Sequence, residues 1–189
     1  MTFRKILKWP DQSLREVSDE ASLDDKIIVG DLLDTFRVVG GYGLSAPQIG
    51  FKKRIIVINE DLLKGEDKGL KEKIMINPSI VRQEGKKNFK ESCFSIEEAT
   101  FEVERFSNIE FTYTSVNGDL KKESASGYHA VCIQHEIDHL NGILMLDKLS
   151  NLKKTMFLKK KKKSNLKRKR EKNLEIEQPK PGFRKKKRK

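Results

Sequence analysis

The residues best suited to chemistry form the pentapeptide His135-Glu136-Ile137-Asp138-His139. Histidines four positions apart on a helix project from one face about one turn apart, so both imidazoles can reach a single cation. A glutamate after the first histidine lies beside the open position of such an ion, where it can accept a proton from water. The pentapeptide therefore predicts a metal-dependent hydrolytic site rather than a solvated helix with polar i, i+4 contacts.

A catalytic site of this kind normally has a third protein ligand. In one class of zinc proteases another histidine follows the second one by six positions, but that position holds Met145 in this chain. Other zinc proteases use a downstream glutamate, and all the glutamates after His139 stand among the lysines near the end of the chain, at Glu171, Glu175 and Glu177. A true zinc endopeptidase is therefore disfavoured, because it has no third ligand.

Three other residues offer a nitrogen or sulfur ligand. His129 lies about 120° around the helix from His135 and is expected at the surface or in a cap. Cys132 has apolar neighbours and is expected to be buried as a small hydrophobic residue. Cys93 falls in a connection between strand-like segments, and thiolate is a good ligand for iron or zinc. The favoured set is Cys93, His135 and His139, with water in the fourth position.

The periodicity of apolar residues predicts the elements that must position these side chains. Helical spacing behind two aspartates predicts a helix over residues 24–38, which the glycine-rich segment 40–50 ends. Apolar and alternating runs predict strands at 54–59, 74–81, 100–106 and 109–116, and Asn117-Gly118 predicts a hairpin after the last of them. A second helix is expected over 128–140, with Gly142 as its stop.

This order of elements lacks regular alternation of strand and helix, so it favours an α+β fold. We expect mainly antiparallel sheets around a central helix that carries the pentapeptide, with an N-terminal helix and a basic C-terminal tail. A chain of 189 residues with 36% hydrophobic content can supply one modest core plus an appendage.

Charge divides the chain into two parts. Residues 153–189 contain 19 Lys or Arg and three acids, so the net charge of +12 comes from this segment and the rest is mildly acidic. A lysine-rich, low-complexity segment cannot bury enough apolar surface to fold alone. We therefore expect a catalytic domain at 1–152 and a Lys/Arg-rich tail at 153–189 that is disordered or helical.

The sequence also predicts a cytoplasmic protein without a membrane partner. No apolar run near the start resembles a secretory signal, and no later stretch has the length of a transmembrane helix. Two cysteines allow at most one disulfide, so burial or metal binding is the better expectation for each of them.

Three segments in this order resemble the peptide deformylase family: Gly41-Tyr-Gly-Leu-Ser-Ala-Pro-Gln48, Glu91-Ser-Cys-Phe-Ser95 and Gln134-His-Glu-Ile-Asp-His139. The likeness extends over nearly all of residues 1–150. It implies a metal-dependent hydrolase that removes the N-formyl group from the formyl-methionine of nascent polypeptides and releases formate.

The resemblance also implies roles for individual residues. The family holds one divalent ion per chain, typically Fe²⁺, with residues that match Cys93, His135 and His139; Zn²⁺, Ni²⁺ and Co²⁺ are alternatives for such a site. The residue matching Glu136 acts first as a base and then as an acid. Negative charge on the formyl oxygen is met by the ion, by the side chain matching Gln48 and by the backbone N–H matching Phe94.

Substrate-binding residues are expected in the first two motifs, at Gly41, Tyr42, Gly43 and Ser92. The two glycines allow the backbone to approach a bound peptide, which would lie alongside like an added strand.

The chain departs from the family pattern in its middle motif and beyond. Ser92 stands where glycine is usual and Phe94 where leucine is usual, while Glu97 and Thr100 replace a common proline and a common arginine. These changes bear on the shape and charge of the peptide groove. They also motivate an alternative, a catalytically altered relative that acts as a ribosome- or RNA-binding protein.

The basic tail predicts a polyanionic partner. Lysine and arginine runs bind phosphate backbones through counterion release, and family members act at the ribosome. We therefore expect residues 153–189 to tether a monomeric enzyme to ribosomal RNA.

Overall fold

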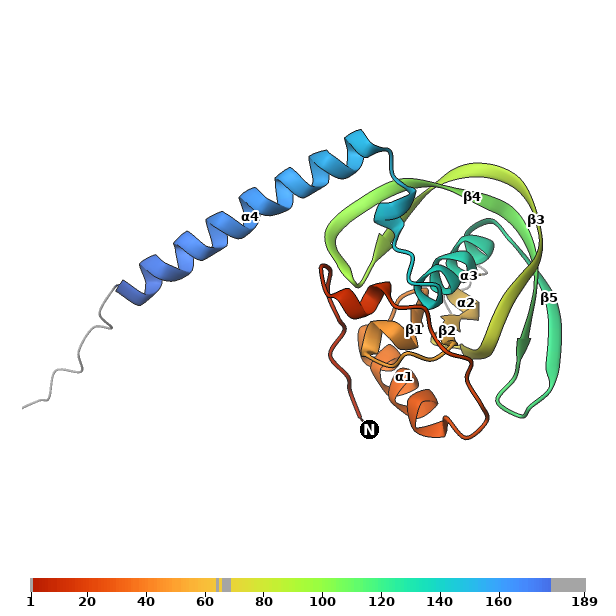
Figure 1. The fold of residues 1–189 in the computed structure, drawn as a ribbon. Helices are drawn as coiled ribbons and strands as arrows, with labels where there is room; N and C mark the ends of the chain where they lie inside the picture. Colours follow the sequence, from red (N-terminus) through yellow and green to blue (C-terminus); the bar gives the residue numbers. More distant parts are fainter. Residues whose placement is uncertain (1, 64, 66–68, 178–189) are drawn as a thin grey trace, which may run out of the picture. The chain divides into compact units, whose positions relative to one another are not determined.

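The computed structural model describes residues 2–63, 65 and 69–177, and for residues 165 and 167–177 the backbone alone. Two compact units follow one another along the chain, Met1–Lys148 and Leu149–Lys189 (Figure 1). The predicted division at residue 152 stays a prediction, and residues 178–189 of the predicted tail lie outside the described residues. The site residues predicted from the sequence all belong to the first unit.

An N-terminal helix, α1, spans Lys26–Val39 where residues 24–38 were predicted to be helical. Its side chains Leu32 and Phe36 are fully buried. The helix ends at Gly40, whose φ of 67° lies in the left-handed region and whose N–H donates to the Phe36 carbonyl. The glycine-rich segment that follows is ordered as a short strand, β1, and a 3₁₀ helix, η2 (Ala46–Ile49).

Within the described residues, five strands form one antiparallel sheet in the order β1-β2-β3-β4-β5. Their bounds are β1 Gly43–Ser45, β2 Ile55–Asn59, β3 Glu72–Cys93, β4 Ile96–Thr114 and β5 Leu120–Ser126. The expected α+β fold with antiparallel pairing is confirmed, with one continuous sheet in place of several. The β4–β5 hairpin contains the predicted Asn117-Gly118 turn.

β3 and β4 are far longer than the apolar pattern predicted. Segments 100–106 and 109–114 belong to the single strand β4 although separate strands were expected, and residues 115–116 of the second predicted strand lie beyond its end. Residues 82–90 continue β3. Most of residues 82–90 are exposed, so they lack the alternation of buried and exposed positions by which a strand is predicted. Cross-strand pairing with β4 holds them in β3, and this pairing runs from Ile76↔Thr114 to Cys93↔Ile96.

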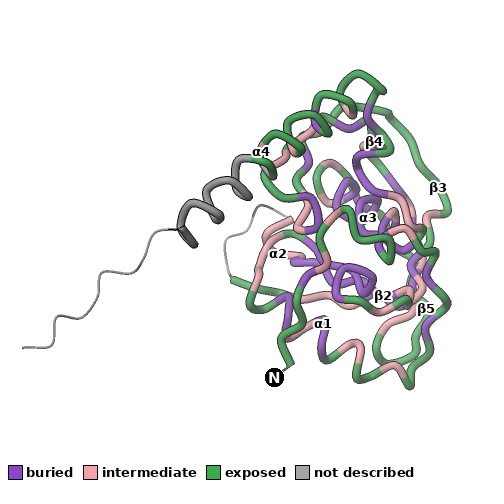
Figure 2. The backbone as a smooth tube through the Cα atoms, turned by 60° about the vertical axis from the view of Figure 1, so that its left-hand side comes forward, coloured by how far each residue is buried: buried purple, intermediate pink, exposed green. Residues whose placement is uncertain are grey.

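The predicted central helix is α3, Gly127–Leu140, and the long β3–β4 hairpin curls around it (Figure 1). β2 is buried at every residue and α3 at most of its residues (Figure 2). Ile133 and Leu140 of α3 pack with Ile56 and Ile58 of β2 in one core cluster.

A second core cluster lies on the opposite face of β2, where Ile55 and Val57 pack with Leu32 and Phe36 of α1. Because successive side chains of a strand point to opposite faces, β2 is buried along its whole length between the two helices. The site helix is thereby held against a strand that is itself covered on both sides.

The remaining helices are short, apart from the one in the second unit. They are η1 Gln12–Arg15, α2 Glu60–Leu63, η3 Met145–Lys148 and α4 Asn151–Glu177. Residues 153–177 of the predicted tail are therefore helical. None of the helices in the described residues has the length and apolar content needed to cross a bilayer.

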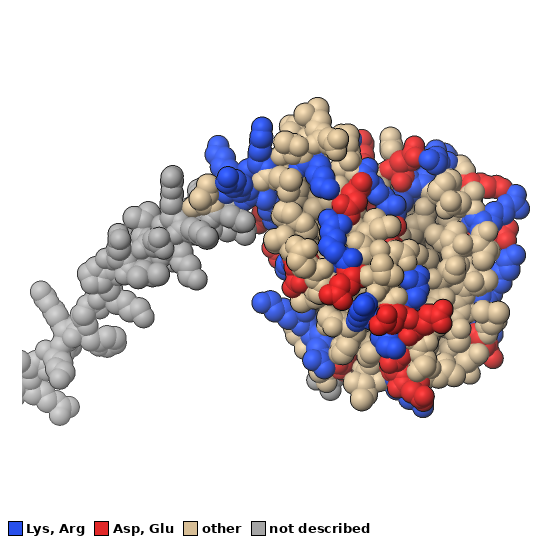
Figure 3. Space-filling model, in the orientation of Figure 1, with Lys and Arg blue, Asp and Glu red and all other residues tan. Residues whose placement is uncertain are grey.

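Acidic and basic side chains are interspersed on the visible face of the first unit rather than gathered by sign (Figure 3). This agrees with the small net charge of residues 1–152 in the sequence. The concentrated positive charge of the chain belongs to residues 153–189.

Gly142, the predicted helix stop, follows α3 with φ of 70°. A Cβ atom at this position would lie 2.3 Å from the backbone oxygen of Arg15. We expect Gly142→Ala to lower the free energy of unfolding by about 2 kcal/mol or more, because left-handed strain adds to the backbone clash. Denaturant unfolding measures this change.

The matched control is Gly30→Ala. Gly30 lies within α1 and has open space around an added Cβ. This substitution should leave stability unchanged or raise it by about 0.5–1 kcal/mol. Equal effects of the two substitutions would contradict the account of Gly142.

Candidate metal centre

Three side chains from two elements converge at one point. Cys93 is the last residue of β3, and His135 and His139 lie one turn apart on α3. Ligand atoms of the three residues all lie within 4.8 Å of one another. The Cys93 Sγ atom lies 3.3 Å from His139 Nε2, and the two imidazole rings are 4.9 Å apart between centroids.

The donor set fits a divalent transition metal ion. Bond lengths for sulfur and imidazole ligands place two donors of one tetrahedral ion about 3.3–3.6 Å apart, which agrees with the separation of Cys93 and His139. Thiolate and imidazole are ligands that iron and zinc accept.

Electrostatics favour the thiolate form of Cys93. Burial alone would raise the pKa of this thiol, but His139 and His135 hold it well below its usual range. For His135 the signs are reversed. Burial would lower the pKa of this imidazole, whereas its hydrogen bonds with Cys93 and Glu91 raise the pKa well above the usual value. The thiolate is the form of cysteine that binds metals.

A buried ion pair orients His135. The Glu91 Oε2 atom lies 2.8 Å from His135 Nδ1. Glu91 also accepts hydrogen bonds from Arg105, through Nε at 2.7 Å and through a second nitrogen at 3.0 Å. Burial would raise the pKa of Glu91, but His135 and Arg105 lower it to about 2. Glu91 is therefore ionised and holds one ring nitrogen of His135, so the other faces Cys93.

The network continues beyond Arg105. Its guanidinium also contacts Asp138, which lies 3.1 Å from the Lys148 ammonium. The motifs contained Glu91 and Asp138, yet the sequence reasoning gave neither a role. Arg105 was missed altogether, although a charged residue in the apolar alternation of 101–106 is a signal that a buried partner is needed.

Glu136 lies beside this group in a pocket shaped by Gly43. Glu136 is 4% exposed, and burial raises its pKa. A Cβ atom on Gly43 would lie 2.8 Å from Glu136 Oε1 and 2.9 Å from Cys132 Sγ, so only glycine fits at this position. Within the described residues, the buried Oε2 atom of Glu136 has no hydrogen-bond partner.

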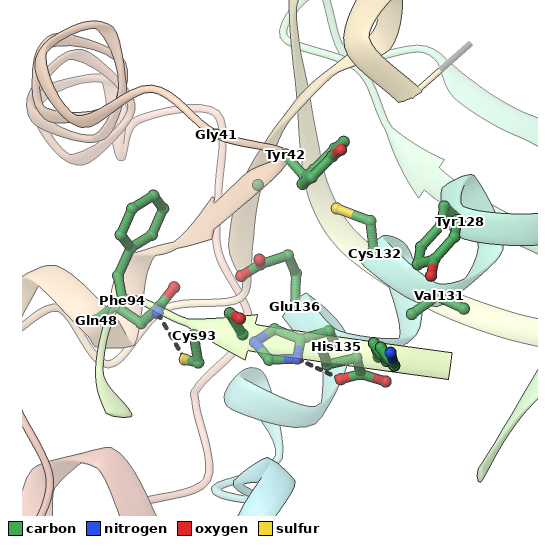
Figure 4. Close-up of a pocket in the computed structure, with 14 residues that line it drawn as sticks. Gly41, Tyr42, Gln48, Cys93, Phe94, Tyr128, Val131, Cys132, His135 and Glu136 are labelled. Atoms are coloured by element: carbon green, nitrogen blue, oxygen red, sulfur yellow. Dashed lines mark hydrogen bonds and ion pairs between the residues drawn. The ribbon is translucent and has the colours of Figure 1, made fainter. Parts of the chain in front are cut away.

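Gln48 presents its amide nitrogen to the site. The Ser45 backbone N–H and hydroxyl donate to Gln48 Oε1 at 2.9 and 3.0 Å, which fixes the side chain. Its Nε2 atom donates to Cys93 Sγ at 3.6 Å and to Ser95 Oγ at 3.3 Å. Figure 4 shows Gln48 and Cys93 facing each other on the side of the cavity away from Tyr128.

A cavity of about 350 Å³ opens beside this Cys-His-His group. It is lined by predicted site residues, namely Gly41, Tyr42, Gly43, Gln48, Ser92, Cys93, Phe94, His135 and Glu136. The lining also includes Lys90, Glu91, Tyr128, Val131 and Cys132, for which the sequence predicted no role in the site. The Phe94 ring covers Gly41 so closely that a Cβ there would lie 2.8 Å from it. Tyr128 and Val131, one helical turn apart, form an apolar wall.

Two other candidate ligands stand outside the group. His129 is half-buried in the first turn of α3. Cys132 is buried, its sulfur points away from His135 in Figure 4, and burial raises the pKa of its thiol well above the usual value. Cys132 is therefore a packing residue in the wall of the cavity.

Three residues that depart from the family pattern, Ser92, Glu97 and Thr100, contact polar side chains of this chain. Ser92 and Thr100 face each other across β3 and β4, and their hydroxyl oxygens lie 2.8 Å apart. Glu97 lies 3.2 Å from the Lys8 ammonium. These substitutions therefore stand outside the ligand group and leave it intact.

Together, the α+β fold and the Cys-His-His group beside a buried glutamate define the class of metal-dependent hydrolases. Comparison with known sequences is more specific. The polypeptide deformylase family matches residues 3–155. Peptide deformylases of Rhodopseudomonas palustris and Pelagibacter ubique are 38% and 39% identical to this chain; each alignment covers 87% of it and 95% and 98% of the relative, respectively.

Solved structures give the same result. A peptide deformylase from Legionella pneumophila superposes with a TM-score of 0.77 at 34% identity, over 94% of this chain and all of that one. A peptide deformylase from Ehrlichia chaffeensis in complex with actinonin gives 0.76 at 35% identity, over 87% and 98% of the two chains. This chain belongs to the polypeptide deformylase family.

The buried network predicts a large effect of Arg105→Met. The substitution leaves the carboxylates of Glu91 and Asp138 without their buried partner, which should lower the free energy of unfolding by about 3–5 kcal/mol. Metal affinity should also fall by roughly 10–100-fold, because His135 loses its orientation. Denaturant unfolding and a metal titration measure the two effects.

Arg82→Met serves as control, since the Arg82 side chain is 65% exposed. It should change stability by less than about 1 kcal/mol. If Arg105→Met were as mild as the control, Arg105 would have no role in holding His135.

Proposed function

We propose that this chain hydrolyses the N-terminal formyl group of nascent polypeptides that begin with formyl-methionine, and that the residues of the candidate metal centre perform the reaction. One observation carries the proposal: a thiol, two imidazoles and a buried carboxylate meet at the end of a cavity that can receive a methionine side chain. Membership of the deformylase family supports the same activity.

Cys93, His135 and His139 would hold the metal ion, one per chain. The soft thiolate and two imidazoles suit Fe²⁺, the ion we propose for this protein, and they also accept Zn²⁺, Ni²⁺ or Co²⁺. When bound, the ion supplies Lewis acidity and lowers the pKa of a water molecule toward neutrality. Glu91 contributes by keeping His135 in the tautomer and orientation that present its second nitrogen to the site.

Glu136 moves the proton. Its carboxylate accepts a proton from the attacking water and delivers it to the methionyl nitrogen as the amide bond breaks. The absence of a side chain on Gly43 lets this carboxylate approach the strand along which the peptide would lie. The buried Oε2 atom of Glu136 supports this role. Within the described residues it has no hydrogen-bond partner, so it is available to accept the proton.

Gln48 and Phe94 stabilise the negative charge that develops on the formyl oxygen. The Gln48 amide nitrogen faces the site because Ser45 holds the amide oxygen, which orients this donor before the substrate binds. The backbone N–H of Phe94, directly after Cys93, is the second donor.

Tyr42 and Ser92 line the cavity with Gly41 and Gly43 and would contact the substrate. The apolar wall at Tyr128 and Val131 suits a methionine side chain. The peptide beyond the methionine would lie in extended form beside the strand that contains Gly43.

A catalytically altered relative is not favoured. Its motivation was the set of departures from the family pattern, and those residues pair with neighbours outside the ligand group. The predicted catalytic and metal-binding side chains meet in one site.

The basic tail provides a second contact, with ribosomal RNA. Residues 153–189 contain 19 Lys or Arg, and such a charge density binds phosphate backbones with little sequence selectivity. We propose a monomer in the cytoplasm that is concentrated at the ribosome, where its nascent substrate emerges.

The proton-transfer role predicts that Glu136→Gln abolishes most activity. Formate release from a formyl-Met peptide by iron-loaded protein, handled without oxygen, should fall by about 10²–10⁴-fold because the amide cannot accept a proton. Metal content should be unchanged, since Glu136 is not among the proposed ligands. The matched control is Glu102→Gln at an exposed site on β4, which should retain full activity.

Two outcomes would contradict the proposal. Formate release by the unmodified chain no faster than by Glu136→Gln would exclude the proposed reaction. Loss of metal from Glu136→Gln would show that this residue is a ligand rather than the base.

The tail proposal predicts salt-sensitive binding to ribosomes. Replacing the five lysines Lys159–Lys163 with glutamine should weaken co-sedimentation at low salt and make it less dependent on salt between about 50 and 200 mM. Formate release from a short peptide should not change. Unchanged co-sedimentation would show that these lysines do not bind the ribosome.

A further inference from the structure

The N-terminal segment 7–9 contacts two parts of the candidate site, η2 and the turn after Cys93. The Leu7 N–H donates to the backbone oxygen of Gln48 at 2.8 Å, and the Trp9 N–H donates to the backbone oxygen of Ser95 at the same distance. Lys8 lies between these two bonds in the sequence. The segment therefore joins the loop of the amide donor to the turn that follows the cysteine ligand.

The Lys8 side chain is directed to that turn. Its ammonium donates to the backbone oxygen of Phe94 at 2.7 Å and lies 3.2 Å from a carboxylate oxygen of Glu97. Both partners follow Cys93 within a few residues. Both contacts are exposed, so neither contributes much to the free energy of unfolding. The bond to the Phe94 carbonyl matters for position, because it is charge-assisted and directional and acts on the backbone of the turn.

Regular strand pairing does not fix the backbone around this turn. Cys93 pairs with Ile96, but the register shifts between Ser92 and Cys93, so the regular ladder does not hold the residues just beyond the turn. Glu98, among them, adopts φ of 58°, in the left-handed region that non-glycine residues rarely occupy. Such a conformation persists only where surrounding contacts hold it.

We propose that Lys8 is a positioning residue for deformylation. By holding the Phe94 carbonyl, its ammonium fixes the Phe94–Ser95 peptide unit. This restrains the turn that carries the neighbouring Phe94 N–H, the proposed second donor to the formyl oxygen. The inference rests on the proposed function for its chemistry. It adds a side chain from the N-terminal segment, outside all three motifs.

The test compares full-length, iron-loaded proteins. Lys8→Met keeps the aliphatic stem but removes the ammonium, and Lys8→Arg restores a cationic donor. Lys5→Met is the matched control, because Lys5 is an exposed lysine in the same segment. Glu97→Gln removes the ion pair and leaves the bond from Lys8 to Phe94.

Lys8→Met should lower kcat by about tenfold, because a misdirected donor is lost mainly in the transition state, while KM changes by less than about twofold. Metal content and the denaturation midpoint should match the unmodified chain. Lys8→Arg should recover most of kcat, Glu97→Gln should lose less than Lys8→Met, and Lys5→Met should behave as the unmodified chain.

Hydrogen–deuterium exchange provides a readout that does not depend on activity. Amides of residues 93–97 should exchange faster in Lys8→Met, with unchanged exchange in α3. An unchanged kcat, or a fall in kcat that accompanies metal loss, would overturn the positioning role. Should the unmodified chain release no formate, the proposed function fails, while exchange at residues 93–97 still tests the anchor.

Discussion

The site depends on the contact between the end of β3 and one face of α3. Cys93 comes from a long hairpin and the two histidines from a buried helix, so nothing in the local chain brings them together. The sheet does so by curling around α3, while β2 is covered on both faces and holds the helix in place. The Cys93 thiol and the His139 ring consequently lie 3.3 Å apart.

A buried ion pair orients the His135 ring that packing brings to the site. A buried imidazole can turn about its side-chain bonds, but Glu91 holds one nitrogen of His135 and Arg105 holds Glu91. An ionised carboxylate in the interior is stable only with such a partner. The network thus links the orientation of a proposed metal ligand to the stability of the fold, and the Cys93 turn has its own anchor at the N-terminal segment.

The motifs and the periodicity of apolar residues predicted much of this arrangement. The helix at 128–140, the antiparallel pairing and the Asn117-Gly118 turn follow local rules that one sequence displays, and the Cys-His-His set follows from helical spacing and the shortage of other ligands. The extent of β3 and β4 did not follow, because residues 82–90 are exposed and carry no alternation. Arg105 and Lys8 were missed for a related reason: their partners lie on distant segments, which spacing along the chain does not identify. For Arg105, its place in the apolar alternation of 101–106 indicates burial but does not name the partner.

The central claim is that Cys93, His135 and His139 bind a single ion. X-ray absorption at the iron edge of the full-length protein, loaded without oxygen, tests it most directly. The account predicts one sulfur and two imidazoles in the first coordination shell, with the sulfur contribution lost in Cys93→Ser. A first shell of nitrogen and oxygen alone in the unmodified protein would contradict the account.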